Sequence, residues 1–201
     1  MGSYSVVVVV GLMLSSAVGA PATSTVVNLQ RAYEAELNAA AAFSAFARRA
    51  EQEGFVEVAR LFRAMVLGEH AHAQNHADVM RALGAQPRAA IAEIEVKSTR
   101  ENLEAAIARE TFDRDAMYPT LLGEAREIRD LTPRGTLALA MAVETAHLKM
   151  LQAALEHMDS PGEVAGELCV ARRSGYVTAC AGPAPIMPTA SSPGAHRQGG
   201  R

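Results

Sequence analysis

Two short segments of the chain each carry a glutamate followed three residues later by a histidine. The first pair is Glu69 and His72, and the second is Glu144 and His147. In an α-helix this spacing places the carboxylate and the imidazole on one face, where both can bind the same metal ion. One such pair in a Glu-rich helical sequence is weak support for a metal site. Two pairs, 75 residues apart, are stronger support.

Each pair is preceded by another glutamate at nearly the same distance. Glu36 lies 33 residues before Glu69, and Glu110 lies 34 residues before Glu144. If each stretch folds as an antiparallel helical hairpin, the earlier glutamate is level with the later pair. The ligand set is then four carboxylates and two imidazoles, which is typical of a di-iron or di-manganese centre in the core of a helical bundle. His70 and His76 are not expected to be ligands: we expect them to be exposed, or beside a ligand at most.

Four amphipathic runs supply the helices that must position these residues. They cover residues 28–53, 55–83, 98–128 and 132–159, and they repeat apolar residues at helical spacing. Gly54 separates the first two runs, Ser98 and Glu101 form a capping-box pattern, and Thr132 followed by Pro133 indicates a helix start. Pro119 lies inside the third run, where a kink is expected.

The connection between the second and third runs is long enough to cross the whole bundle. Its 14 residues, 84–97, reach ~46 Å when extended, against ~43 Å for the preceding helix. The other two connections are short and favour antiparallel pairs. The sequence therefore predicts an all-α fold, a ferritin-like four-helix bundle of two antiparallel helix pairs joined by a long crossover.

Composition agrees with a helical fold and excludes several classes of protein. Alanine occupies 40 of 201 positions, aromatic residues are 4% and tryptophan is absent, which disfavours an all-β fold. The net charge of −3 gives no basic excess for binding nucleic acid. Two cysteines are too few for a four-thiolate metal site.

The N-terminal segment has the pattern of an export signal. No charged side chain precedes Arg31, the run from Val6 to Leu14 is almost wholly apolar, and small residues follow up to Ala20. We expect residues 1–20 to be a cleaved signal peptide, the protein to be exported and periplasmic, and no membrane association after cleavage. The alternative is a buried or interfacial N-terminal segment, because the first five residues include no basic side chain.

Residues 28–158 resemble the di-iron domain of the rubrerythrins. Besides the two Glu-x-x-His pairs, the resemblance is carried by Asn28-Leu29…Glu36, by Gly54-Phe55…Phe62, and by Asn102-Leu103…Glu110-x-x-Asp113…Met117-Tyr118-Pro119.

The resemblance implies roles for individual residues. Glu36, Glu69, Glu110, Glu144 and His147 match residues that bind iron in the family. The position of His72 alternates there with the position of Asp113 as one iron shifts with its redox state, and Tyr118 matches a tyrosine that hydrogen-bonds a ligand carboxylate. Two departures affect this expectation: Asp113 stands where the family usually has Glu, and Phe43 stands where it usually has Tyr.

The family resemblance also implies an activity. Rubrerythrins reduce hydrogen peroxide to water with two electrons from a di-iron centre, which an external donor then restores. An iron-oxidising or iron-binding ferritin-like protein and a non-catalytic metal-binding bundle of the cell envelope are the alternatives. The residue types leave iron and manganese open, and the resemblance implies a homodimer.

The C-terminal segment resembles a degenerate rubredoxin-like module, which in rubrerythrins has two Cys-x-x-Cys pairs. Here Cys169 and Cys180 remain, and Ser174 stands where another thiolate would be. Because one iron in such a module needs four thiolates, we expect no iron here. The cysteines form a disulfide in an oxidising compartment, or else stay two free thiols. The expected organisation is a signal peptide (1–20), a rubrerythrin-like domain (21–160) and a largely flexible tail (161–201).

Overall fold

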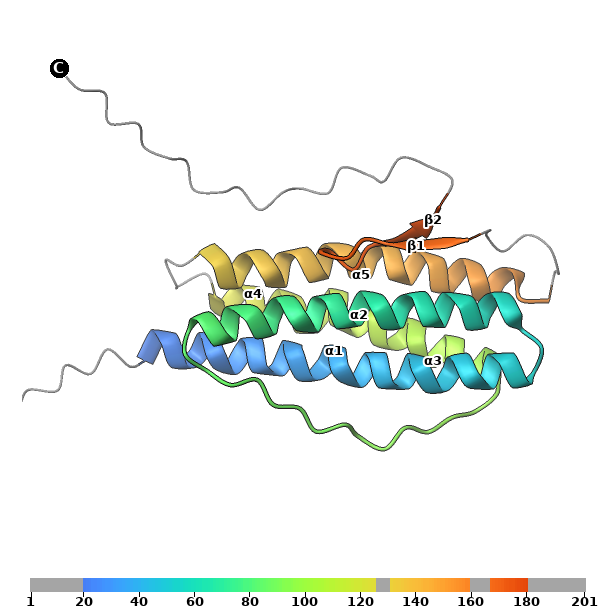
Figure 1. The fold of residues 1–201 in the computed structure, drawn as a ribbon, viewed down its shortest axis with the longest axis horizontal. Helices are drawn as coiled ribbons and strands as arrows, with labels where there is room; N and C mark the ends of the chain where they lie inside the picture. Colours follow the sequence, from blue (N-terminus) through green and yellow to red (C-terminus); the bar gives the residue numbers. More distant parts are fainter. Residues whose placement is uncertain (1–19, 126–130, 160–166, 181–201) are drawn as a thin grey trace, which may run out of the picture.

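A computed structural model of the protein describes residues 20–125, 131–159 and 167–180. Within these ranges the chain forms a helical bundle with a small β-hairpin against it (Figure 1). The elements are α1 (Ala20–Gln52), α2 (Val56–Ala82), α3 (Thr99–Phe112), the π-helical segment η1 (Asp113–Met117), α4 (Tyr118–Ala125), α5 (Leu131–His157), β1 (Leu168–Val170) and β2 (Val177–Ala179).

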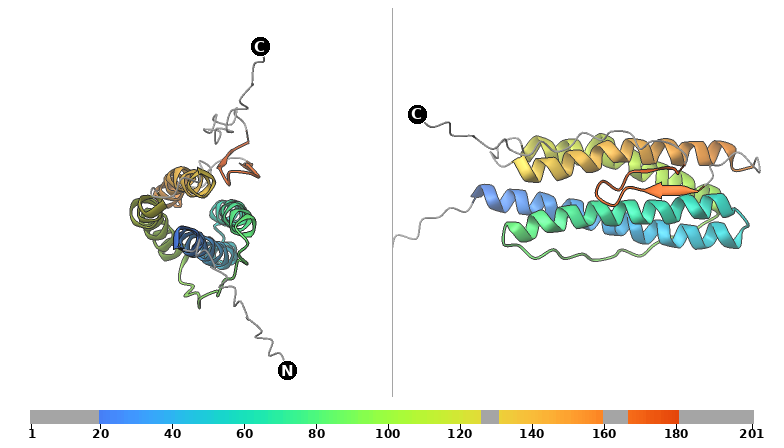
Figure 2. Two further views of the ribbon diagram at one scale, coloured as in Figure 1. Left: turned by 90° about the vertical axis from the view of Figure 1, so that its left-hand side faces the viewer. Right: turned by 45° about the horizontal axis from the view of Figure 1, so that its top comes forward.

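Four helical columns make up the bundle, as the sequence predicted. Figure 2, viewed along the helices, shows α1, α2, α5 and the α3–η1–α4 column around a common core. The α1–α2 turn is tight, and its Gly54 has a φ of 85°, a left-handed conformation that glycine adopts without strain. The predicted all-α ferritin-like bundle is confirmed.

The first helix is longer than predicted. It begins at Ala20 and not at Asn28, and Pro21 falls in the first turn, where a missing backbone N–H is tolerated. Thr25 is buried and Val26 packs against a core cluster, which explains why these residues join the bundle. Residues 1–19, which hold most of the predicted signal peptide, lie outside the described residues.

The third column begins as predicted but departs from the α-helix before Pro119. Ser98 accepts a hydrogen bond from the backbone N–H of Glu101, whose carboxylate accepts one from the backbone of Ser98, so the capping box is present. Where the sequence predicted a kink at Pro119, the chain widens into η1 just before the proline, and the Tyr118 N–H donates to the carbonyl of Asp113. This longer bond accommodates the proline, which has no N–H to donate and would crowd the carbonyl four residues earlier.

The last helix agrees with the prediction to within the usual uncertainty of helix ends. It runs from Leu131 to His157, so Thr132 lies in its first turn and does not precede it. Residues 126–130, between α4 and α5, lie outside the described residues.

The crossover runs along the bundle as an extended chain. Residues 85–98 have no regular secondary structure, and Figure 1 shows them alongside α1. Three side chains at helical spacing on α1 hold the backbone of residues 88, 90 and 92 by hydrogen bonds; they belong to Gln30, Glu34 and Asn38.

Residues 167–180, part of the C-terminal tail that the sequence predicted to be largely flexible, have a defined structure. Residues 168–170 and 177–179 pair as an antiparallel hairpin, with Val177 buried in the bundle core. Cys169 and Cys180 form a disulfide, the first of the two outcomes that the sequence left open. Residues 160–166 and 181–201 lie outside the described residues.

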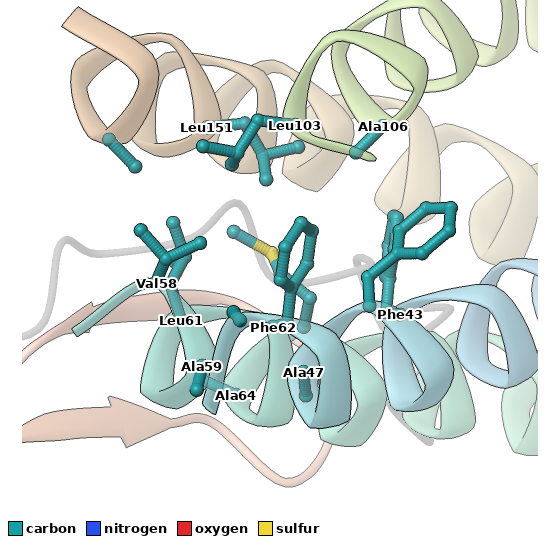
Figure 3. Packing of buried hydrophobic residues seen from close by; sticks show 14 of the residues in the cluster. Phe43, Ala47, Val58, Ala59, Leu61, Phe62, Ala64, Leu103, Ala106 and Leu151 are labelled. Atoms are coloured by element: carbon teal, nitrogen blue, oxygen red, sulfur yellow. The ribbon is translucent and has the colours of Figure 1, made fainter. Parts of the chain in front are cut away.

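Two apolar layers fill the bundle at different levels. Figure 3 shows Phe43 and Phe62 pointing toward Leu103, Ala106 and Leu151 across the core. The second layer contains four large side chains, one from each column: Leu29, Met80, Leu121 and Leu137. In every column the predicted metal-binding residues lie between the two layers. No helix among the described residues is long and apolar enough to cross a membrane.

Candidate metal centre

Six of the seven predicted metal-binding residues meet in the level between the two apolar layers. They form two groups, in each of which one ligand atom per residue lies within 4.8 Å of the others. Each group has one glutamate and one histidine of its own and shares two glutamates with the other. The groups are Glu36, Glu69, His72 and Glu144, and Glu69, Glu110, Glu144 and His147.

The two shared carboxylates each turn one oxygen to each group. Glu69 Oε2 lies 3.2 Å from His72 Nδ1, and its Oε1 lies 3.1 Å from His147 Nδ1. Glu144 Oε1 lies 3.0 Å from His72 Nδ1, and its Oε2 lies 3.3 Å from His147 Nδ1. Glu69 and Glu144 are therefore placed to bridge two metal ions.

The remaining two glutamates occupy equivalent places at opposite ends of this arrangement. Glu36 Oε2 lies 3.9 Å from His72 Nδ1, and Glu110 Oε2 lies 3.9 Å from His147 Nδ1. The two imidazole rings are stacked, with centroids 5.6 Å apart. Each metal ion would thus receive one terminal glutamate, one histidine and one oxygen from each bridging carboxylate.

The burial of these residues requires a partner that the protein alone does not provide. All six are at most 2% exposed. Several of their oxygens, including both of Glu110 and both of Glu144, and Nδ1 of His147 have no hydrogen-bond partner among the described residues. Buried polar atoms without partners destabilise a fold by about 1–3 kcal/mol each. Metal coordination would satisfy them, so these residues fit a dinuclear centre.

The four carboxylates divide into two kinds by their pKa. Burial, followed by the charges of Glu144 and Glu69, raises the pKa of Glu36 and of Glu110 well above the usual range. Burial also acts on the bridging pair, but the neighbouring Glu110 carboxyl and the charge of His72 hold the pKa of Glu144 well below its usual value. His147 lowers the pKa of Glu69 against burial and the charge of Glu144.

The two histidines hold protons when no metal is bound. Burial disfavours their charged forms, but Glu144 raises the pKa of His72 well above its usual value, and Glu69 raises that of His147 to about 10. Two imidazolium ions then balance the charges of the two bridging carboxylates, and the raised pKa of Glu36 and of Glu110 favours their neutral forms. Such a balance lowers the cost of burying the cluster without metal.

Tyr118 reaches this centre as the sequence predicted. It is fully buried, and its hydroxyl donates a hydrogen bond to Glu36 Oε1. Burial and the neighbouring Glu36 carboxyl raise the pKa of Tyr118 well above its usual value, so the hydroxyl keeps its proton and remains a donor.

Asp113, the seventh predicted residue, lies outside both groups. It is 6% exposed, at the start of η1, and its Oδ2 lies 3.6 Å from Arg109 Nε. Burial raises its pKa to about 7, although Arg109 acts against this. In this arrangement His72, and not Asp113, lies among the ligand atoms.

The other two histidines of α2 differ from each other. His70 is exposed, as expected. His76 is fully buried and bonded to Tyr118 and Thr136, so it belongs beside the ligands. Phe43 lies in the first apolar layer, its ring 5.8 Å from that of Phe62.

Sequence analysis missed the residues that contact the far side of the histidine ligands. His72 Nε2 lies 2.9 Å from the carbonyl oxygen of Ser174, and His147 Nε2 lies 3.1 Å from that of Gly175. These are backbone groups, so side-chain types do not reveal them. The one signal was Gly68, a glycine inside a helix next to Glu69, since such a residue often marks a close approach of another chain segment.

The fold and the site together define a ferritin-like four-helix bundle with a carboxylate-rich dinuclear metal centre. Comparison with known proteins agrees. Residues 28–155 match the rubrerythrin family. The chain is 28% identical over 147 residues to nigerythrin of Nitratidesulfovibrio vulgaris, covering 73% of each protein. It is 30% identical over 126 residues to rubrerythrin-2 of Clostridium acetobutylicum, covering 62% of this chain and 68% of that one.

Solved structures show the same fold. A mixed-valence state of nigerythrin aligns with a TM-score of 0.72 at 23% identity, over 84% of this chain and 80% of that one. A bacterioferritin of Mycobacterium tuberculosis aligns with a TM-score of 0.63 at 28% identity, over 72% and 91%. The chain belongs to the rubrerythrin family. Its cofactor is a di-iron centre, for which the two carboxylate–histidine groups supply the ligands.

Proposed function

We propose that this protein reduces hydrogen peroxide to water with electrons from an external donor. The observation that carries the proposal is the geometry of Glu69 and Glu144, each of which turns one oxygen to each histidine. With this placement, Glu69 and Glu144 would hold two metal ions in a common site. Membership of the rubrerythrin family supports the same activity.

When bound, two ferrous ions supply the two electrons that the reduction of one peroxide molecule requires. The reaction also consumes two protons, and the chain can hold a proton close to the centre. Asp113, with a pKa of about 7, carries one on its carboxyl group at neutral pH in part of the molecules. The Tyr118 hydroxyl donates a hydrogen bond to Glu36 and so holds this terminal carboxylate in the orientation in which it would bind an ion.

The enclosure of the site favours a small substrate. Its six metal-binding residues are buried between two apolar layers, which exclude bulky molecules from the ions. Hydrogen peroxide is small enough to enter such a site, and burial strengthens the electrostatic interactions inside it.

The electrons come from outside the described fold in this proposal. Both cysteines of the chain are in one disulfide, so neither is free to bind iron. We also propose that the protein is exported to the periplasm; the uncharged, apolar N-terminal segment and a disulfide, which persists in oxidising compartments, support this. The homodimer implied by the family remains a prediction.

Stopped-flow oxidation of the anaerobic, diferrous protein tests the activity. About one equivalent of hydrogen peroxide per pair of irons should oxidise the centre, because two electrons reduce one O–O bond, and it should do so faster than dioxygen. With a chemical reductant present, peroxide should then be consumed over many turnovers. The Glu69→Ala variant, which lacks one bridge, is the inactive control.

Two other outcomes would contradict the proposal. Faster oxidation by dioxygen, followed by growth of a ferric mineral, would indicate an iron-oxidising or iron-binding protein. Loaded protein that consumes no peroxide with reductant present would indicate a non-catalytic metal-binding bundle.

A further inference from the structure

The hairpin of residues 167–180 lies against the bundle beside the two histidine ligands. Figure 2 shows it over α2 and α5, the helices that carry them. Its turn directs two consecutive backbone carbonyls inward, the one of Ser174 to His72 Nε2 and the one of Gly175 to His147 Nε2. A carbonyl oxygen can only accept a hydrogen bond. Both Nε2 atoms must therefore carry their hydrogen, and each Nδ1 faces the carboxylates.

We propose that this disulfide-closed hairpin is a positioning element for the metal centre. It holds both histidines in the tautomer and orientation in which Nδ1 binds metal. The Cys169–Cys180 disulfide keeps the two strands together and so keeps the turn in contact with the histidines. The inference rests on the dinuclear site and not on the proposed peroxidase activity. Backbone partners of this kind fix the orientation of a metal-bound imidazole and raise its basicity.

The contact between the turn and α2 is so close that both surfaces need glycine. A Cβ atom at position 175 would lie 2.6 Å from His72 Nε2 and 2.6 Å from the carbonyl oxygen of Gly68. A Cβ atom at position 68 would lie 2.8 Å from the carbonyl oxygen of Gly175. A glycine inside a helix costs about 1 kcal/mol relative to alanine. The close contact with the hairpin turn explains why position 68 is a glycine despite this cost.

Further contacts anchor the hairpin at both ends. Near the turn, Asn75 Nδ2 donates to the carbonyl oxygen of Arg173 at 2.7 Å, and Gly175 N donates to that of Ala171 at 2.8 Å. Val177, the first residue of β2 after the turn, is buried in the bundle core, and near the open end the disulfide joins the two strands. The turn is thus held from α2 and from its own strands.

Hairpin and metal should consequently stabilise each other. If the docked hairpin favours the metal-binding tautomer, metal must favour the docked hairpin by the same free energy, because coupling between two binding equilibria is reciprocal. Opening the disulfide loosens the strands and so weakens metal binding. The cysteines that the family resemblance assigned to a lost iron module thereby serve the remaining centre.

Two variants with the same backbone requirement provide the test. Gly175 has a φ of 76° and Gly84 a φ of 79°, so alanine is strained in either position. A Cβ atom at Gly84 meets nothing within 4 Å, and Gly84→Ala is therefore the matched control. We expect Gly175→Ala to weaken metal binding about tenfold to a hundredfold, the effect typical of losing such hydrogen-bond partners. Co(II) binding in competition with a chelator measures this, and the control should bind like the parent protein.

A second measurement reports on the hydrogen bonds themselves. In Co(II)-loaded parent protein, the paramagnetically shifted Nε2–H protons of His72 and His147 should exchange slowly with water. In Gly175→Ala they should exchange rapidly. The double variant Cys169→Ser/Cys180→Ser adds no atom near the histidines, and it should change both measurements in the same direction.

Either of two results would overturn the proposal. One is a Co(II) affinity of Gly175→Ala and of the cysteine variant equal to that of Gly84→Ala. The other is continued protection of both Nε2–H protons in these variants. If Gly175→Ala does not fold, the Co(II) affinity and the Nε2–H exchange of the cysteine variant alone test the proposal. Failure of the peroxidase proposal would leave these metal-binding results unaffected.

Discussion

The Nε2 atom of His76 lies 3.1 Å from the hydroxyl oxygen of Tyr118, and this contact connects a buried histidine to the metal centre. Burial and the neighbouring charge of His72 lower the pKa of His76 to about 3, so the ring is neutral. One arrangement of hydrogens then satisfies every partner. Thr136 donates to His76 Nδ1, His76 Nε2–H donates to Tyr118, and Tyr118 donates to Glu36.

Replacing His76 should affect stability more than metal content. His76→Phe removes the donor to Tyr118 and leaves the Thr136 hydroxyl without this partner, so we expect a loss of about 1–3 kcal/mol in the free energy of unfolding. His76→Gln, which keeps a donor and an acceptor, should lose less. Urea unfolding measures both, and iron analysis should still find two ions per chain. Loss of iron as complete as in His72→Ala would instead make His76 a ligand.

The bridging and terminal glutamates should differ in what their removal does. Glu69 and Glu144 belong to both ligand groups, so Glu69→Ala or Glu144→Ala should remove most of the bound metal. Glu36 and Glu110 each belong to one group, so Glu36→Ala or Glu110→Ala should weaken the binding of one ion more than that of the other.

Elemental analysis of protein purified without added metal, followed by titration, measures these losses. The exposed His70 provides the control, because His70→Ala should retain two ions. Equal metal loss in His70→Ala and Glu69→Ala would refute the assignment of the site.

The sequence predicts this centre well where side-chain spacing carries the information. Glu69 with His72 and Glu144 with His147 lie one helical turn apart, and their periodicity is visible without a structure. The partners of His76 were not predictable in this way. Tyr118 is 42 residues away and Thr136 is 60 residues away, so the contacts arise only when α2, α4 and α5 pack together.

Backbone groups and helix geometry mark the other limits of prediction from sequence. The carbonyl of Ser174 meets His72 across 102 residues, and any residue type at that position would have one. Asp113 illustrates a different limit. Its place in the sequence motif suggested a ligand, but the position of its carboxylate depends on the π-helical geometry of η1 and on the contact with Arg109. Spacing identifies which residues share a helix face, while tertiary packing decides what each of them contacts.

Metal binding should release protons near neutral pH. In the metal-free protein, raised pKa values keep protons on His72, His147, Glu36 and Glu110. Binding of two divalent ions must displace them, so we expect about four protons per ion pair. Since protons compete with metal, the apparent affinity should fall as the pH is lowered.

An anaerobic titration with Fe(II) in weakly buffered solution, followed with a pH indicator, counts these protons. The Glu36→Gln variant has an amide in place of one acid and should release about one proton fewer. Release of no protons would show that the metal-free site is already deprotonated, contrary to the charge balance described above.

Asp113 should make the metal-free protein less stable as the pH rises. Its pKa in the folded protein is about 7, against 3.8 for an aspartate exposed to water, so the folded state holds this proton more tightly than the unfolded state does. The resulting stabilisation is fully present below the unfolded pKa and is lost as the pH rises through about 7. Asp113→Asn cannot ionise and should escape this loss.

Urea unfolding of both metal-free proteins at pH 5 and pH 8 measures the effect: the stability of Asp113→Asn relative to the parent should increase between the two values. An unchanged difference would mean that Asp113 ionises in the folded protein as it does in the unfolded chain, with Arg109 compensating for its burial.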